Sequence, residues 1–228
     1  RVLDLGDGRP FAHWCEGGQT NVVLSAIDRK RGTSSYGKAA LVWEGEDGAQ
    51  STWTFADIDR RTCELAWGLR GLGLGRGDVV GMYLPNLPHA AVAMLAVAKI
   101  GAIVLPMFSG FGADAIAQRL NDGQAKALIT VDGSLRRAKP VGAKAVVDEA
   151  LRASPGVAHV VVLSHLATPH EWKQGRDHWW HELTAGAPSD VAAVPTESMP
   201  ADDPFLLMFT SGTSGKPKGV VHTHCGFP

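Results

Sequence analysis

A run of hydroxyl, glycine and lysine residues near the end of the sequence has the composition needed to bind a polyphosphate. The run covers residues 210–219 and follows an unbroken apolar segment, residues 205–209, which predicts a buried strand. Glycines let backbone N–H groups approach phosphate oxygens, hydroxyls donate hydrogen bonds, and lysine neutralises charge. We therefore predict phosphate contacts from Thr210, Ser211, Gly212, Thr213, Ser214, Gly215 and Lys216.

The same segment does not match the Walker A loop of P-loop nucleotide hydrolases. That loop needs a glycine five positions before the glycine of its Gly-Lys pair and a hydroxyl residue directly after the lysine. Thr210 and Pro217 occupy these two positions here. The remaining alternative is a flexible surface turn, and the apolar strand just ahead favours the phosphate-binding interpretation over it.

The elements that must position this loop follow from an alternation of apolar runs and helical patterns. The expected helices are residues 54–69, 88–99, 113–121 and 143–152, and the expected strands are residues 79–84, 102–105, 127–131 and 159–164. Thr54 and Asp57 form a capping-box-like start for the first helix. Strands separated by helices imply right-handed crossovers, so we predict an α/β fold with a mostly parallel sheet and helices on both faces.

These patterns divide the chain into four segments. The expected divisions are an N-terminal covering segment with one strand at residues 39–43 (1–53), an α/β subdomain (54–184), a proline-containing surface connection (185–204), and the strand with the phosphate-binding loop (205–228).

Charge and composition exclude several classes of protein. The sequence has 22 Lys and Arg against 23 Asp and Glu, so no basic excess indicates a nucleic-acid partner. Cys15, Cys63 and Cys225 have no C-x-x-C spacing, which indicates neither a disulfide framework nor a zinc site and fits a reducing cytoplasm. His222 and His224 could face a metal from one strand, but no third ligand has suitable spacing. We predict no metal site.

Residues 90–108 are almost wholly apolar and long enough to imitate a membrane span. Pro88 is typical of a helix start, and Lys99 with Gly101 is typical of a helix end. A helix followed by a core strand therefore explains this segment, and no membrane span is predicted.

Residues 210–219 closely resemble the phosphate-binding signature of the AMP-forming acyl- and aryl-adenylating enzymes. Further segments are similar to the acetyl-CoA synthetase branch, namely residues 21–29, 40–44, 54–58, 77–86, 93–102, 108–122, 179–183 and 219–226. The resemblance implies part of the large N-terminal domain of an adenylate-forming enzyme. It also implies a two-step reaction: a carboxylic acid and Mg-ATP give acyl-AMP and pyrophosphate, then coenzyme A gives acyl-CoA and AMP.

The resemblance implies coenzyme A contacts after the predicted strand at residues 127–131. Gly110, Arg136, Arg137 and Lys139 are the candidates, and family members commonly have arginine where Lys139 stands. Lysine keeps the charge but loses the bidentate fork of arginine. The alternative is that these basic residues form a solvated turn.

By the same resemblance, the chain is expected to stop before the rest of the catalytic machinery, with no catalytic residue inside it. We expect this cytoplasmic fragment to be inactive, and self-association is expected where apolar surface stays exposed. Acetate or another short-chain acid is the expected substrate. Two alternatives stay open: an adenylating enzyme that loads a carrier protein, and a non-catalytic ATP-binding fragment.

Overall fold

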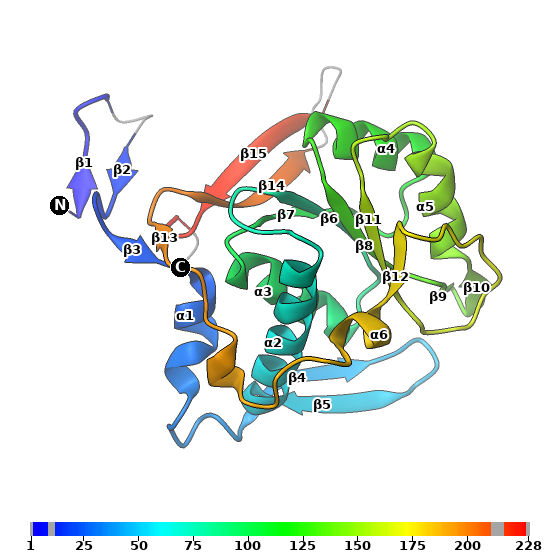
Figure 1. Ribbon diagram of the computed structural model, residues 1–228, viewed down its shortest axis with the longest axis horizontal. Helices are drawn as coiled ribbons and strands as arrows, with labels where there is room; N and C mark the ends of the chain where they lie inside the picture. The colour runs from blue at the N-terminus through cyan, green and yellow to red at the C-terminus, as the bar shows by residue number, and fades with distance from the viewer. Residues whose placement is uncertain (1, 9–11, 211–216, 227–228) are drawn as a thin grey trace.

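A seven-stranded sheet forms the centre of the molecule (Figure 1). The computed structural model describes residues 2–8, 12–210 and 217–226. The strand order is β12-β11-β8-β6-β7-β14-β15, and every neighbouring pair is parallel except β14 with β15. The strands are β6 (Val79–Tyr83), β7 (Ile103–Pro106), β8 (Ala127–Val131), β11 (His159–Leu163), β12 (Asp177–Trp179), β14 (Pro204–Thr210) and β15 (Lys218–Thr223).

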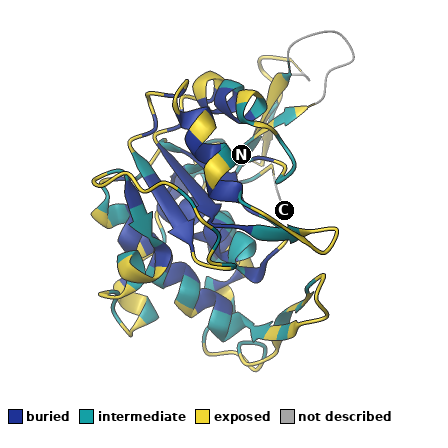
Figure 2. Cartoon of the chain, turned by 90° about the vertical axis from the view of Figure 1, so that its right-hand side faces the viewer, coloured by how far each residue is buried: buried dark blue, intermediate teal, exposed yellow. Residues whose placement is uncertain are grey.

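Helices cover both faces of this sheet. The first group contains α1 (Val22–Ala26), α2 (Phe55–Gly71), α3 (Pro88–Lys99) and α6 (Trp180–Thr184), in which α2 packs against α3 and α6, and α3 also packs against α1. The second group contains α4 (Ala113–Asp122) and α5 (Ala143–Leu151). Figure 2 shows the buried strands in dark blue between helices with exposed outer surfaces. The predicted α/β class, with a mostly parallel sheet covered on both faces, is confirmed.

Local sequence explains how α2 and α3 begin. The Thr54 side chain accepts a hydrogen bond from the Asp57 backbone N–H, and the Asp57 carboxylate accepts one from the Thr54 N–H, so the predicted capping box is present. Pro88 stands in the first turn of α3. This helix is buried on most sides, which explains its apolar sequence. In the described part of the chain, no helix has the length and apolarity needed to cross a bilayer.

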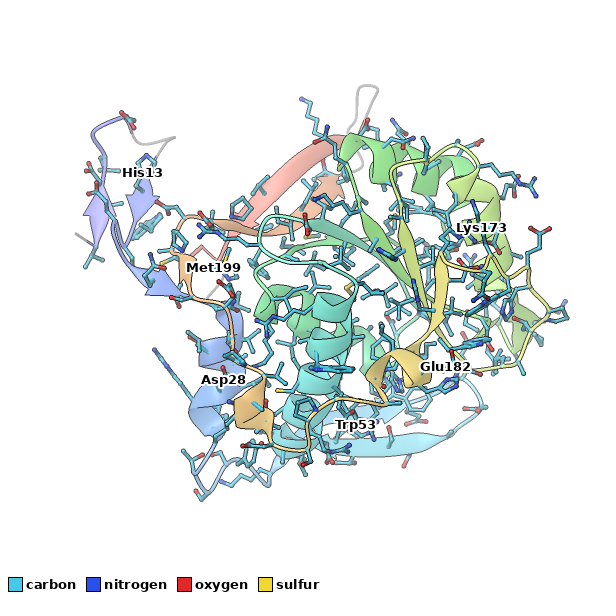
Figure 3. All side chains as sticks on the ribbon, viewed as in Figure 1. His13, Asp28, Trp53, Lys173, Glu182 and Met199 are labelled. Carbon is cyan, nitrogen blue, oxygen red and sulfur yellow. The ribbon has the colours of Figure 1, made fainter. Side chains whose placement is uncertain are left out.

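Short strands lie around the central sheet. They pair two by two: β1 (Leu3–Asp4) with β2 (His13–Trp14), β3 (Gln19–Thr20) with β13 (Met199–Pro200), β4 (Ala39–Glu44) with β5 (Gln50–Thr54), and β9 (Ser134–Arg136) with β10 (Lys139–Val141). Among the residues that the structure describes, the 3-10 helices are η2 (Asp28–Lys30) and η3 (Val191–Ala193). In Figure 3, His13 lies on the N-terminal extension, whereas Met199 of β13 lies against the main body. The division of the chain into four segments stays a prediction.

One sequence expectation about β14 is wrong in part. Phe205 and Leu206 are buried as expected, but Met208 is 44% exposed. Strand β14 pairs with β7 at Leu206, which is the partner of Val104. Beyond Leu206, as far as Thr210, β14 pairs only with β15. The second half of the apolar run therefore lies beside a single strand, which leaves part of its surface open.

Candidate functional site

A cleft of about 580 Å³ opens at the carboxyl ends of the parallel strands. The connection after β6 leads through α3 to β7, whereas the connection after β8 leads through α5 in the opposite direction to β11. Ligands of open α/β sheets bind where the strand order reverses in this way. The cleft is lined by the strand-end loops and the β4–β5 turn, through residues 43–47, 84–87, 107–109, 134–136, 141 and 165–166.

Two of the predicted coenzyme A residues lie next to each other at this cleft. Arg136 lines the cleft from β9 and is exposed. A Cβ atom at Gly110 would stand 3.1 Å from Nη2 of Arg136 and 2.5 Å from Cε1 of Phe108. Any side chain at Gly110 would therefore displace the Phe108 ring. The fold brings together two residues that are 26 positions apart in the sequence.

Arg137 and Lys139 lie on the same hairpin but do not line the cleft. Arg136 faces Lys139 across β9 and β10, and the turn between them consists of Arg137 and Ala138, with φ of 53° and 58°. Positive φ at both central residues is typical of tight hairpin turns. The Ala138 N–H donates to Oε2 of Glu46 at 2.9 Å, which joins this turn to the β4–β5 turn. The basic residues thus belong to an ordered, exposed hairpin.

Asp132 holds two walls of the cleft together. It follows β8 directly, is 1% exposed, and its Oδ1 accepts from the N–H groups of Gly133, His165 and Leu166 at 2.6, 2.9 and 3.1 Å. Its Oδ2 accepts from the Ala167 N–H at 2.7 Å. Hydrogen bonds to a carboxylate are stronger than those between neutral groups, so this side chain fixes the loops after β8 and β11. Sequence reasoning did not identify this role, although an aspartate directly after a buried strand is a usable signal.

Tyr83 supports the third wall. Its hydroxyl oxygen lies 2.9 Å from the carbonyl oxygen of Ser109 and 3.0 Å from that of Phe111, so it holds the loop that contains Gly110. Burial raises the pKa of Tyr83, and the hydroxyl therefore keeps its proton and can donate at neutral pH.

The predicted phosphate-binding loop connects β14 to β15. Thr210 is the last residue of β14, it pairs with Lys218, and its hydroxyl donates to the Lys218 carbonyl oxygen at 3.4 Å. This end of β14 lies at the carboxyl edge of the sheet, as the cleft does. The other predicted phosphate-binding residues lie outside the described residues: Ser211, Gly212, Thr213, Ser214, Gly215 and Lys216.

The model of one protein family, described as AMP-binding enzyme, matches residues 29–227. The chain belongs to the AMP-binding enzyme family. Acetyl-coenzyme A synthetase of Deinococcus radiodurans is 42% identical over 228 residues, which cover 100% of this chain and 34% of the relative. Acetyl-coenzyme A synthetase of Mycobacterium tuberculosis is 42% identical over 229 residues, covering 99% and 35%.

A solved structure of the acetoacetyl-CoA synthetase from Streptomyces lividans is similar to this AMP-binding family member, with a TM-score of 0.87 and 32% sequence identity. The similarity covers 99% of this chain and 33% of that protein. The chain therefore spans about a third of the length of the relatives it matches. The resemblance to AMP-forming acyl-CoA synthetases, inferred from residues 210–219 and the further segments, is confirmed.

Proposed function

We propose that the protein is an ATP-dependent acid–CoA ligase and that this chain supplies its phosphate-binding loop and its coenzyme A cleft. One observation carries the proposal: the family match over residues 29–227 includes the glycine- and hydroxyl-rich loop at the carboxyl end of β14. The names of the relatives support acetate, or another short-chain acid, as the substrate. A cytoplasmic location stays a prediction.

In the first step, a carboxylate oxygen attacks the α-phosphorus of ATP and the bond to pyrophosphate breaks. Negative charge develops on the leaving pyrophosphate, and backbone N–H groups, hydroxyls and an ammonium group held there stabilise that charge. The loop from Thr210 to Lys216 has these groups. Mg²⁺ is expected to enter with ATP, whose phosphate oxygens are its main ligands, and the Thr210 hydroxyl suits such a hard cation.

In the second step, the thiol of coenzyme A attacks the acyl carbonyl carbon and AMP leaves. We expect Arg136 to bind a phosphate group of coenzyme A, and its position in the lining of the cleft supports this role, because a guanidinium can form a bidentate contact with phosphate. Gly110 leaves room beside that guanidinium. Arg137 and Lys139 would add positive charge from the outer side of the hairpin.

Pyrophosphate exchange into ATP tests the proposal. The protein that carries this chain would be assayed across a panel of carboxylic acids with coenzyme A omitted. We expect exchange that depends on one short acid. No exchange with any acid, by a folded protein that binds ATP, would replace the proposal with a non-catalytic ATP-binding role.

A second assay separates the two thiol acceptors. After adenylation, free coenzyme A and a pantetheine-bearing carrier protein would be offered in separate reactions. We expect acyl-CoA to form with free coenzyme A. Transfer to the carrier protein alone would support the carrier-loading alternative.

A further inference from the structure

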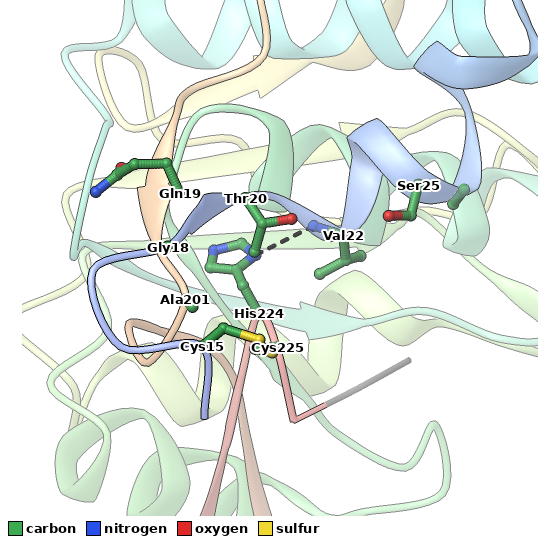
Figure 4. Close-up of a pocket in the computed structure, with 10 residues that line it drawn as sticks. Cys15, Gly18, Gln19, Thr20, Val22, Ser25, Ala201, His224 and Cys225 are labelled. Atoms are coloured by element: carbon green, nitrogen blue, oxygen red, sulfur yellow. Dashed lines mark hydrogen bonds between the residues drawn. The ribbon is translucent and has the colours of Figure 1, made fainter. Parts of the chain in front are cut away.

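We propose that Cys15 and Cys225 form a reversible disulfide that fastens the N-terminal segment to the chain directly after β15. The two Sγ atoms lie 3.3 Å apart, although 210 positions separate the residues in the sequence (Figure 4). The sequence pattern indicated no disulfide, because no short spacing links these cysteines. This inference does not depend on the proposed function.

Backbone hydrogen bonds fix both cysteine-bearing segments to the same turn. The Ala201 N–H donates to the Gly18 carbonyl oxygen at 3.0 Å, and the Cys225 N–H donates to the Ala201 carbonyl oxygen at 2.9 Å. The His224 N–H donates to the Asp203 carbonyl oxygen at 3.1 Å. Hydrogen bonds to residues 201–203 therefore hold both cysteine-bearing segments in place.

A tight turn sets the position of Cys15. Its φ is 54° and that of Gly17 is 73°, both in the left-handed region. The Gly18 N–H donates to the Cys15 carbonyl oxygen at 2.7 Å, and a Cβ atom at Gly18 would stand 2.6 Å from that oxygen. Glycine at position 18 thus allows the close turn that directs Cys15 toward Cys225.

The geometry requires a small movement to make the bond. A disulfide has a sulfur–sulfur distance of about 2.0 Å, so the two Sγ atoms must approach by about 1.3 Å. Both residues are partly exposed and line a cavity of about 510 Å³, which gives a small oxidant access. Cys63, in contrast, is buried, and its burial raises the pKa of its thiol to about 11.

Thiol–disulfide exchange with a small disulfide such as glutathione disulfide would form the bond. The thiolate of one cysteine attacks a glutathione sulfur, which forms a mixed disulfide and releases one glutathione. The thiolate of the second cysteine then attacks the protein sulfur of that mixed disulfide and releases the second glutathione. The two protein thiols lose two electrons, the glutathione disulfide gains them, and the two thiol protons end on the released glutathiones.

The rate of this exchange should rise with pH. The hydrogen bond to Cys15, assisted by desolvation, raises the pKa of the Cys225 thiol, so little thiolate is present at neutral pH. Faster closure in mildly alkaline buffer is therefore expected.

Peptide mapping of the 228-residue chain after treatment with glutathione disulfide, without reduction, tests the proposal. We expect a monomer lighter by two hydrogen atoms, in which the peptide of Cys15 is joined to the peptide of Cys225 and one thiol of the three remains. Thermal unfolding should shift upward by about 5 °C in the oxidised chain and return after reduction. Products that are linked between chains, that involve Cys63, or that carry separate glutathiones on Cys15 and Cys225 would overturn it.

Matched variants sharpen the test. Cys15→Ser and Cys225→Ser should each abolish the cross-link and the thermal shift, whereas Cys63→Ala should keep both. If Cys63→Ala does not fold, the oxidised wild-type chain would be treated with an alkylating agent first in its native state and again after unfolding. Cys63 should then be the one thiol that reacts only after unfolding. A thermal shift that persists in Cys225→Ser would contradict the proposed bond.

Discussion

The cleft beside β8 and the β14–β15 hairpin lie at the same edge of the sheet, yet the chain supports them differently. The cleft rests on buried polar anchors, Asp132 and Tyr83, that hold three of its loops. The hairpin has exposed apolar side chains instead, with Met208, Val220 and Val221 at 44, 41 and 54% exposure. Figure 1 shows β15 as the outermost strand of the sheet.

This difference separates a region stabilised by internal hydrogen bonds from a region whose apolar surface is available for contact. Hydrogen bonds between distant segments of the described chain fix the geometry of the cleft, so its shape is set by packing within this chain. Exposed apolar side chains on an edge strand mark a surface suited to contact with another surface. We therefore expect mutations in the two regions to differ in kind: loss of stability at the cleft, and changed association at the hairpin.

The largest effect is expected from Asp132→Ala. The change leaves four N–H groups without their carboxylate acceptor, which should lower the free energy of unfolding by about 3 kcal/mol. Urea unfolding measures it, with the exposed Asp122→Ala as the control. A loss below about 1 kcal/mol would show that Asp132 does not hold the cleft walls.

A pH dependence is expected from two histidines that the fold shields from solvent, the partly buried His89 and the buried His224. His89 lies between the rings of Trp53 and Trp180, at 5.1 and 5.6 Å, and His224 follows β15. Burial lowers the pKa of each from 6.5 to about 4. Between these values the unfolded chain binds a proton that the folded chain does not bind. The free energy of unfolding should therefore fall as pH decreases from 6.5 to 4, by on the order of 3 kcal/mol per group at most.

Unfolding of His89→Gln and His224→Gln at pH 7 and pH 4.5 checks this pH dependence. Each variant should lose less stability on acidification than the wild type, whereas the exposed His181→Gln should lose as much as the wild type. The same pH dependence in all four proteins would contradict the assignment.

Affinity for coenzyme A should separate two neighbouring arginines. Arg136 lines the cleft and Arg137 does not, so Arg136→Glu should weaken binding by roughly 10- to 100-fold, as expected for the loss of a charge-assisted contact. Arg137→Glu should weaken it by no more than about threefold, because exposed charges contribute little. Calorimetric titration of the protein that carries this chain measures both. Equal losses of coenzyme A affinity in the two variants would indicate only a general effect of charge and would contradict a specific contact by Arg136.

The smallest effect on stability is expected on the hairpin. Met208→Lys together with Val220→Lys should reduce self-association in sedimentation experiments and change the free energy of unfolding by less than about 0.5 kcal/mol. Val42→Lys is the control, since Val42 is 75% exposed on β4, away from the hairpin. If the double variant, Val42→Lys and the wild type associate equally, the hairpin is not a contact surface.

The sequence predicted the central α/β elements well because their signals are local. Helix α3 and strand β8 have the predicted bounds: a proline starts the helix, a lysine ends it, and the strand is a short apolar run. Strand β12, Asp177–Trp179, was not predicted, because three residues, two of them polar, are too few to show an apolar periodicity, and their strand geometry depends on pairing with β11.

Contacts between distant segments could not be predicted in the same way. Arg136 and Gly110 were proposed from a resemblance, and their proximity depends on how β7 and β8 flank β6. The Asp132 contacts reach residues 33 to 35 positions away, and the Cys15–Cys225 contact spans 210. Such pairs follow from packing of the whole fold, which residue patterns do not encode individually.

The central claim is that the hairpin loop serves adenylation and the cleft serves thioester formation. The direct test measures the two half-reactions separately in Lys216→Ala and Arg136→Glu, within the protein that carries this chain. We predict that Lys216→Ala slows acid-dependent ATP–pyrophosphate exchange by roughly 100-fold and leaves thioester formation from preformed acyl-AMP nearly unchanged, with the opposite pattern for Arg136→Glu. Equal slowing of both half-reactions by Lys216→Ala would contradict the account.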